Sequence, residues 1–343
     1  MERIGFEALA ALVAQALRRH GASAANAAVL GEVVAAAERD GARSHGLFRL
    51  AGYVSELGCG WVKGDAVPRW LRREGALLLL DGDNGYAQPA FRFGFEAFCA
   101  RARELGLAGL GIRNAHHYAA LWPEVEALAA QGFIALNFRG TRALMAPTGG
   151  RRAVLGTNPL AFACPRAEAP PIVFDMASSA MARGDMMLAA RDGQSVPEGS
   201  GADAAGRPST DPAAILQGGV QWPFGGVKGG LIALMVELLA NAATGGLLAL
   251  EDRSAGVKGA MSANGGQLIL AIDPAATGGA DFAARVEMLA AAVTENGEAR
   301  LPGTRRLAAR ARATAEGIAP DPALLAQLRV LAGEAVAPEG GAG

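Results

Sequence analysis

Apolar positions recur at helical spacing through the first sixty residues. Within residues 6–39 one helical face carries Leu9, Leu12, Val13 and Leu17, and residues 30–37 repeat that spacing. His20-Gly21 separates the two runs as a helix stop. Residues 47–57 show the same spacing once more. The pattern predicts a helical N-terminal part over residues 1–75.

Continuous apolar runs bounded by turn residues follow this part. Residues 76–85, Ala-Leu-Leu-Leu-Leu-Asp-Gly-Asp-Asn-Gly, predict a buried strand that ends in a turn. Further strands are predicted at 108–113, 133–138, 172–175 and 267–272, and helices over 91–98, over 124–130 and after residue 228. A polar stretch at 192–212 predicts an ordered surface loop.

Because strands and helices interleave, the expected class is α/β (mixed α+β). We expect a cofactor-binding and catalytic sheet domain over residues 76–280. Residues 280–335 are predicted to be helical and to pack on the 1–75 part, and residues 336–343 to form a disordered tail.

The most apolar tract, residues 229–250, is a candidate membrane span by its length and composition. It contains Glu237, Asn241 and several glycines, which favours a buried helix packed closely on its neighbours. The N-terminus lacks a signal-peptide pattern. These features predict a cytoplasmic protein without a membrane partner.

Composition and charge narrow the function classes. Apolar residues make up 51% of the chain and charged residues 19%, which is typical of a globular protein. A net charge of -1 argues against nucleic acid as a partner. Three cysteines without CxxC spacing argue against a disulfide framework, and no carboxylate cluster or HxxxH motif suggests a metal. We therefore expect no metal site.

Histidine, the usual side chain for proton transfer at neutral pH, occurs only four times: His20, His45, His116 and His117. His20 ends a helix beside a glycine, where a cation favours the helix dipole. That role is sufficient for His20. The other three are candidates for chemistry.

Ser44-His45-Gly46 follows a helix with a charged end. In one interpretation His45 is an acid or base, and Arg49, one helical turn on, anchors a carboxylate or phosphate. In the other, Ser44 caps a helix among ordinary surface charges. The pattern alone leaves both interpretations open.

Two further segments have the composition of ligand-binding loops. Residues 114–120, Asn-Ala-His-His-Tyr-Ala-Ala, stand between a strand and a helix, where cofactors settle in open sheets. Residues 225–230 place four glycines and Val227 around Lys228, which suits an anion but is not a P-loop. A plain strand-to-helix turn and a glycine turn with a solvated lysine are the alternatives. No GxGxxG opens a βαβ unit.

Two aspartates are candidate partners for a catalytic imidazole. Asp175 ends a strand ahead of Ser178, and Asp185 follows within a dozen residues. An aspartate fixes the tautomer of a histidine and stabilises its charged form. The alternative for Asp175 is to cap the next helix.

Several segments in register resemble the malate/L-lactate dehydrogenase family, which lacks the standard Rossmann domain. They are 39–49, 81–85, 114–120, 156–159, 175–179, 208–212 and 228–239, and the likeness runs from about residue 4 to residue 318. The resemblance implies a non-Rossmann NAD(P)-binding fold, with helical terminal parts around a central sheet, and a homodimer. Residues 117–121 and 182–185 look most like the branch of Δ1-piperideine-2-carboxylate/Δ1-pyrroline-2-carboxylate reductases.

This resemblance implies roles for individual residues. A relay of Ser44, His45 and Asp185 would handle the proton, which raises Asp185 above Asp175. Thr157 and Arg49 would hold the substrate. The cofactor-binding residues implied are Arg49, His117, Tyr118, Ala119, Ala120, Leu121, Asp175, Ser178, Lys228, Arg300 and Arg305. The cofactor implied is NADP(H), with NAD(H) as the alternative, and the arginine at the 2′-phosphate stays open among Arg113, Arg139, Arg142, Arg300 and Arg305.

The activity implied is reduction of a cyclic imine to L-pipecolate or L-proline, with His45 as the acid. A 2-hydroxy-acid dehydrogenase, in which His45 protonates an alkoxide, is the alternative enzyme. A catalytically silent binding relative is the third possibility. The joint presence of His45, Asp185 and Lys228 argues against it.

Overall fold

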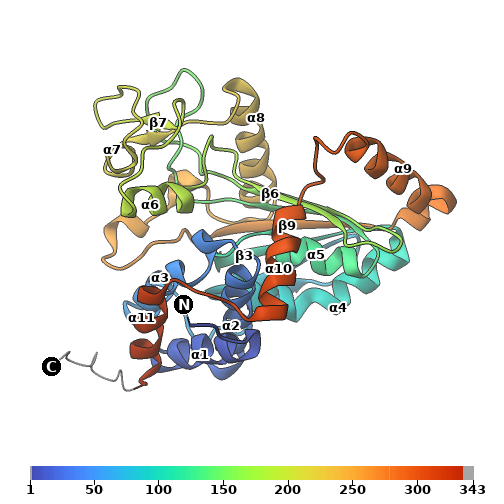
Figure 1. Cartoon of the computed structure of the whole chain (residues 1–343), viewed down its shortest axis with the longest axis horizontal. Helices are drawn as coiled ribbons and strands as arrows, with labels where there is room; N and C mark the ends of the chain where they lie inside the picture. Colours follow the sequence, from blue (N-terminus) through green and yellow to red (C-terminus); the bar gives the residue numbers. More distant parts are fainter. Residues whose placement is uncertain (1, 278, 335–343) are drawn as a thin grey trace.

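The computed structural model describes residues 2–277 and 279–334, and its centre is a seven-stranded sheet (Figure 1). In spatial order the strands are β1 (Arg69–Arg72), β2 (Leu77–Tyr86), β3 (Leu107–His116), β9 (Gly265–Ile272), β4 (Ile134–Arg139), β5 (Leu160–Cys164) and β6 (Ile172–Met176). Only β2 and β3 pair in parallel, and the other pairs of this sheet are antiparallel. The expected mixed α/β class is confirmed.

Helices cover both faces of the sheet. On one face α4 (Ala87–Leu105) and α5 (Trp122–Ala130) pack on a core that includes Leu80, Leu110 and Ile112. On the other face lies α8 (Val227–Val236), which continues into a π-helical turn, Glu237–Ala242, over Phe138. Two-sided cover explains why the strands are continuous apolar runs rather than alternating ones.

A second core lies among the terminal helices. It joins α1 (Phe6–Arg19), α2 (Ala24–Arg39), α3 (Leu50–Gly58) and α11 (Pro322–Ala332). The two helices predicted within 6–39 and the one predicted over 47–57 are confirmed.

The other two C-terminal helices differ in how they sit relative to this core. Helix α10 (Thr304–Glu316) contacts α2, whereas α9 (Phe282–Thr294) projects from the opposite end of the sheet (Figure 1). The domain boundaries at 75 and 280 stay a prediction, and the tail 336–343 lies outside the described residues.

A smaller group of elements flanks the sheet near β6. It comprises α6 (Arg183–Arg191), α7 (Pro212–Leu216), β7 (Gly201–Ala202) and β8 (Val220–Gln221). Met186, Val196 and Ile215 form its core. The surface loop predicted at 192–212 belongs to this group and contains the short strand β7. This group places α6 against the segment that carries Ser44.

The turn predicted at 82–85 is instead a bulge inside β2, which runs on to Tyr86. Asp83 and Asn84 adopt left-handed backbone conformations, with φ of 54° and 57°. The Asp81 carboxylate accepts a hydrogen bond from the backbone N–H of Asp83 at 2.8 Å. Because Asp and Asn tolerate this conformation, the strand absorbs the extra residues and continues.

The expectation that residues 114–116 leave the strand is also wrong, because β3 extends to His116. Asn114, at φ 51°, bulges opposite the bulge in β2, and its side-chain amide donates to Asp81 at 2.9 Å. Strands β1 and β5 were not predicted. Arg69–Arg72 is charged and mostly exposed at the edge of the sheet, so it lacks the apolar signal of a strand.

Helix α8 is not the fully buried helix that its composition suggested. One of its faces is apolar and exposed, and comprises Val227, Leu231, Leu234 and Met235, continued by Leu238 in the turn that follows. The polar residues of the tract, Glu237 and Asn241, point inward: Glu237 accepts hydrogen bonds from Asn158, Asn241 and the backbone of Ala249. Across residues 2–277 and 279–334, every helix is too short or too polar to cross a membrane.

Candidate active site

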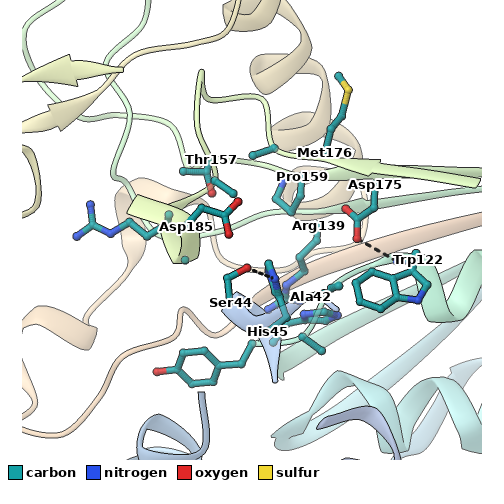
Figure 2. Close-up of a pocket in the computed structure, with 18 of the residues that line it drawn as sticks. Ala42, Ser44, His45, Trp122, Arg139, Thr157, Pro159, Asp175, Met176 and Asp185 are labelled. Atoms are coloured by element: carbon teal, nitrogen blue, oxygen red, sulfur yellow. Dashed lines mark hydrogen bonds between the residues drawn. The ribbon is translucent and has the colours of Figure 1, made fainter. Parts of the chain in front are cut away.

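A cavity of about 920 Å³ lies between the segment that follows α2, the ends of β3, β4 and β6, and the start of α6 (Figure 2). This volume is in the range of sites for small molecules and cofactors. Its lining comes from residues 41–45, 49, 117–120, 122, 139–142, 144, 157, 159, 173–177, 182–185, 188, 261–263 and 300–306. The segment that follows β3 contributes His117 to this lining.

Ser44 and His45 lie in a 3-10 turn, Arg43–His45, between α2 and α3. The Ser44 hydroxyl and Nδ1 of His45 are 3.0 Å apart. The Glu38 carboxylate accepts a hydrogen bond from the Leu47 N–H at 2.7 Å, which fixes the turn to the end of α2. The tight turn directs both side chains toward the cavity.

Burial, the largest effect, lowers the pKa of His45 to about 3 together with the neighbouring Arg49 and His117 side chains. The imidazole is therefore neutral at neutral pH. A carboxylate bound in the cavity offsets the charge of Arg49 and so raises the pKa of His45 from this low value.

Arg49 fixes the backbone of this turn. Its Nε donates to the carbonyl of Ser44 at 2.7 Å, and its guanidinium lies 5.7 Å from the ring centroid of Tyr118. A Cβ added at Gly184 would lie 2.6 Å from Nη2 of Arg49 and 3.0 Å from Cβ of Ser44. Glycine at position 184 thus allows the N-terminus of α6 to pack directly on the Ser44 turn.

Asp185 is exposed in the first turn of α6 and lines the same cavity. Figure 2 shows Asp185 and Thr157 across the cavity from Ser44 and His45. Among the described residues no hydrogen bond joins Asp185 to His45, and the negative charge of Asp185 acts on Arg49. The Ser44–His45 half of the predicted relay is formed, and the role of Asp185 stays a prediction.

His117 faces a buried acid. Its Nε2 lies 3.7 Å from Oε1 of Glu124, and each side chain is only 3% exposed. Burial raises the pKa of Glu124 to about 8 and holds the pKa of His117 well below its usual value, with the charge of Arg139 adding to the latter effect. At neutral pH the pair is mainly uncharged.

His116 has a structural position instead. Its Nδ1 is 2.9 Å from the Ser262 hydroxyl, and its Nε2 is 3.1 Å from the Asn84 side-chain oxygen. Of the four histidines, His45 and His117 line the cavity. Among the described residues no three His, Cys, Asp or Glu side chains gather as they would around a metal.

Asp175, at the end of β6, caps a helix, but not the one that follows it. Its carboxylate accepts hydrogen bonds from the N–H groups of Leu121 at 2.6 Å and Trp122 at 3.1 Å, at the start of α5 (Figure 2). Burial raises the pKa of Asp175 to about 6 despite these two bonds. The alternative that Asp175 caps the next helix is therefore wrong, because it caps α5, and its cofactor role stays a prediction.

The cavity is strongly cationic. Among the described residues, its lining contains two carboxylates, Asp175 and Asp185, and eight arginines: Arg43, Arg49, Arg139, Arg142, Arg183, Arg300, Arg305 and Arg306. Acids outside the lining offset two of these charges, since Arg142 lies 3.3 Å from Asp252 and Arg306 lies 3.7 Å from Glu126. The remaining excess attracts an anionic ligand.

Most of the residues predicted from the sequence meet in this cavity. Those in its lining are Ser44, His45, Arg49, His117, Tyr118, Ala119, Ala120, Thr157, Asp175, Asp185, Arg300 and Arg305. Leu121, Ser178 and Lys228 are not in the lining. The Ser178 hydroxyl donates to the Asn158 carbonyl at 2.7 Å, and Lys228 is exposed in the first turn of α8. Cofactor roles for these three stay predictions.

The arginines considered for a 2′-phosphate divide in the same way. Arg139, Arg142, Arg300 and Arg305 line the cavity, whereas Arg113 does not.

Two residues near the cavity, Glu124 and Arg306, were not predicted from the sequence. Glu124 is a charged residue beside the apolar positions Val125 and Leu128, and this could have been recognised from the sequence. Nothing in the local pattern distinguishes Arg306 from the other arginines of α10.

Comparisons with known proteins agree with one another. The family model described as malate/L-lactate dehydrogenase matches residues 4–329. A Δ1-pyrroline-2-carboxylate/Δ1-piperideine-2-carboxylate reductase of Pseudomonas putida is 48% identical over 92% of this chain and 93% of its own length. The reductase of the same description from Pseudomonas aeruginosa is 40% identical over 96% of this chain and 99% of its own.

Solved structures repeat this likeness. The Δ1-piperideine-2-carboxylate reductase of Pseudomonas syringae has a TM-score of 0.94 and 44% identity, and the match covers 96% of this chain and 100% of that one. A sulfolactate dehydrogenase of Methanocaldococcus jannaschii has a TM-score of 0.85 and 28% identity over 97% of this chain and 98% of its own.

Proposed function

Because the chain belongs to the malate/L-lactate dehydrogenase family, we propose that it reduces the C=N bond of Δ1-pyrroline-2-carboxylate and Δ1-piperideine-2-carboxylate with NADPH. The products are L-proline and L-pipecolate. The observation that carries the proposal is the identity of 40–48% to reductases of these two imino acids over nearly the whole chain. The cavity supports it, since it joins a hydrogen-bonded Ser44–His45 pair to an excess of arginines.

The residues present fit a nicotinamide dinucleotide. The lining of the cavity extends from Ser44 to the 300–306 segment, and its arginines suit the phosphates of such a molecule. Arg300 and Arg305 are exposed on that segment and suit the extra phosphate of NADPH, which favours NADPH over NADH. The bound cofactor supplies the hydride that adds to C2 of the imine.

The protein then has to manage one proton at the ring nitrogen. Ser44 holds Nδ1 of His45, which leaves Nε2 as the nitrogen that exchanges a proton with the substrate. A carboxylate in the cavity offsets the charges that lower the pKa of His45, and Asp185 adds a second negative charge. Thr157 lines the cavity opposite His45 and hydrogen-bonds the substrate.

The test is NADPH oxidation by the purified protein with Δ1-piperideine-2-carboxylate, pyruvate and oxaloacetate in parallel. We expect the largest kcat/KM with the imine, and a lower value when NADH replaces NADPH. A larger kcat/KM with a keto acid would overturn the proposal in favour of a 2-hydroxy-acid dehydrogenase, to which the likeness to a sulfolactate dehydrogenase lends some support. Absence of NADPH and NADH binding by fluorescence titration would favour a silent binding relative.

A homodimer completes the proposal. In α8 and the turn after it the usual arrangement is inverted, because Glu237 and Asn241 are buried while Leu231 and Leu238 are 62% and 53% exposed. A helix with apolar residues outward and polar residues inward is stable when another apolar surface covers it. A second copy of the chain is the partner that the family likeness favours. A cytoplasmic location, expected from the sequence, also stays part of the proposal.

A further inference from the structure

Arg139 is a buried cation without a counter-ion. It ends β4, is 2% exposed and ranks among the largest fully buried side chains. No carboxylate within residues 2–277 and 279–334 lies within ion-pair distance of its guanidinium. An unpaired buried charge lowers the free energy of unfolding by on the order of several kcal/mol, so proteins rarely keep one without a function.

Two hydrogen bonds fix the position of this guanidinium. Its Nη2 donates to the backbone carbonyls of Ala115, at 2.8 Å, and Ala263, at 3.3 Å. Nη1 and Nε are buried and have no hydrogen-bond partner in the part of the chain that the structure describes. The residue is therefore oriented in advance and has donors to spare, as an anion-binding arginine has.

Two other arginines of the cavity lining, Arg49 and Arg142, already have partners. Nε of Arg49 holds the Ser44 carbonyl, and the charge of Asp185 acts on its guanidinium. Arg142 lies 3.3 Å from Asp252 and donates to the Met261 carbonyl. Burial lowers the pKa of Arg139 to about 9, which still leaves it charged at neutral pH.

The position of Arg139 relative to His45 indicates which anion it meets. Arg139 lines the cavity that His45 and Thr157 line, and Figure 2 shows its side chain beside His45. Arg139, His117 and His45 all line this cavity, and the charge of Arg139 acts on His117. In an imino acid the carboxylate is attached to C2, next to the nitrogen that gains the proton.

We propose that Arg139 binds the carboxylate of the substrate and so places the reacting C=N bond against His45. The proposal rests on the proposed function in one respect only, that the substrate carries a carboxylate on the reacting carbon. A 2-keto acid meets the same condition. A phosphate of the cofactor is the competing anion, and the experiment has to separate the two.

The first arm uses Arg139→Met, which keeps the length of the side chain and removes the charge. KM for Δ1-piperideine-2-carboxylate should rise roughly 10- to 100-fold, the size expected for loss of a charged hydrogen bond. The value of kcat should fall less, because the contact is present in both the ground state and the transition state. The dissociation constant for NADPH, from fluorescence titration, should not change.

The same variant separates binding from a structural role. Replacement of an unpaired buried charge by an apolar side chain should leave the melting temperature unchanged or raise it. The matched control is Arg103→Met, since Arg103 donates to Asp273 at 2.9 Å and is outside the cavity lining. That control should lose stability and keep the KM of the wild type.

The second arm does not depend on turnover. Pyrrole-2-carboxylate and oxamate, planar analogues of the imine and of a keto acid, should raise the melting temperature of the NADPH-bound wild type and not that of Arg139→Met. This arm judges Arg139 even where the wild type reduces no imine, so the two failures are distinguishable. Weaker NADPH binding with intact analogue binding would assign Arg139 to a cofactor phosphate and overturn the proposal. Unchanged binding of both, or no analogue binding by the wild type, would also overturn it.

Discussion

The Ser44 hydroxyl lies 3.0 Å from Nδ1 of His45, so two residues adjacent in the chain form one hydrogen-bonded unit at the cavity. A bond at Nδ1 sets the tautomer of the ring and leaves Nε2 for the substrate. The Arg49 contact to the Ser44 carbonyl and the close approach of Gly184 hold this unit in place.

Replacement of His45 by asparagine should lower kcat by roughly 10²- to 10⁴-fold, the usual contribution of a general acid or base. NADPH affinity should be unchanged, because the side chain handles the proton rather than the cofactor. Stopped-flow and steady-state measurement of NADPH oxidation check this. His20→Asn is the control, since His20 bonds the Ala16 carbonyl at the end of α1. Full activity of His45→Asn would refute the assignment.

The variant Asp185→Asn tests the distant member of the relay. Loss of its negative charge lowers the pKa of a nearby imidazole, because an anion stabilises the protonated ring. The limb of the pH–kcat profile that reports His45 should therefore move to lower pH, and kcat should fall about tenfold or more. Asp192→Asn, at the other end of α6, is the matched control. An unshifted profile in Asp185→Asn would remove Asp185 from the relay.

An alanine at Gly184 should displace α6 from the Ser44 turn. The added Cβ would meet Nη2 of Arg49 at 2.6 Å, closer than packed atoms lie. We expect a loss of about 1–3 kcal/mol in the free energy of unfolding, together with a fall in kcat. Urea unfolding and NADPH oxidation measure the two effects. Gly58→Ala, with no atom within 4 Å of the added Cβ, should be neutral in both.

Glu124→Gln should change how stability depends on pH. In the folded protein burial raises the pKa of Glu124 to about 8 from an ordinary 4.5, so between these values the folded chain binds the extra proton. The free energy of unfolding of the wild type should therefore fall as pH rises through this range, by on the order of 2–4 kcal/mol from about pH 6 to about pH 9.

Glutamine cannot ionise, so the variant should lose most of this dependence. His117, 3.7 Å away, and Asp175 also titrate nearby, and Asp175→Asn serves as the comparison. Urea titrations at several pH values are the measurement. Parallel pH curves for the wild type and Glu124→Gln would contradict a buried, protonated Glu124.

Charges on the exposed face of α8 should prevent the proposed dimer. In the double variant Leu231→Glu with Leu238→Glu, the two new carboxylates would be buried as unpaired charges at the interface, which is unfavourable. Sedimentation velocity should show a dimer for the wild type and a monomer for the double variant. Val330→Glu, on an equally exposed residue of α11, should remain a dimer. A monomeric wild type would refute the homodimer.

The sequence alone determined the elements whose signal is local. Helical spacing over 6–39 and apolar runs such as 108–113 mark helices and strands because each depends on neighbours within a few residues. The pattern alone left the roles of the adjacent residues Ser44 and His45 open, and the resemblance to the family paired them. The resemblance to the family implied that distant residues, such as Asp185 and Thr157, belong to the same site.

Only the tertiary structure decided the rest. The bulge at 83–84 keeps β2 running because Asp81 and Asn114, far apart in the chain, bind across two strands. Asp175 caps α5 rather than the next helix because sheet pairing places β6 beside it. The missing counter-ion of Arg139 is likewise a property of its surroundings. Burial and charge balance arise from contacts between distant segments, and no local pattern contains them.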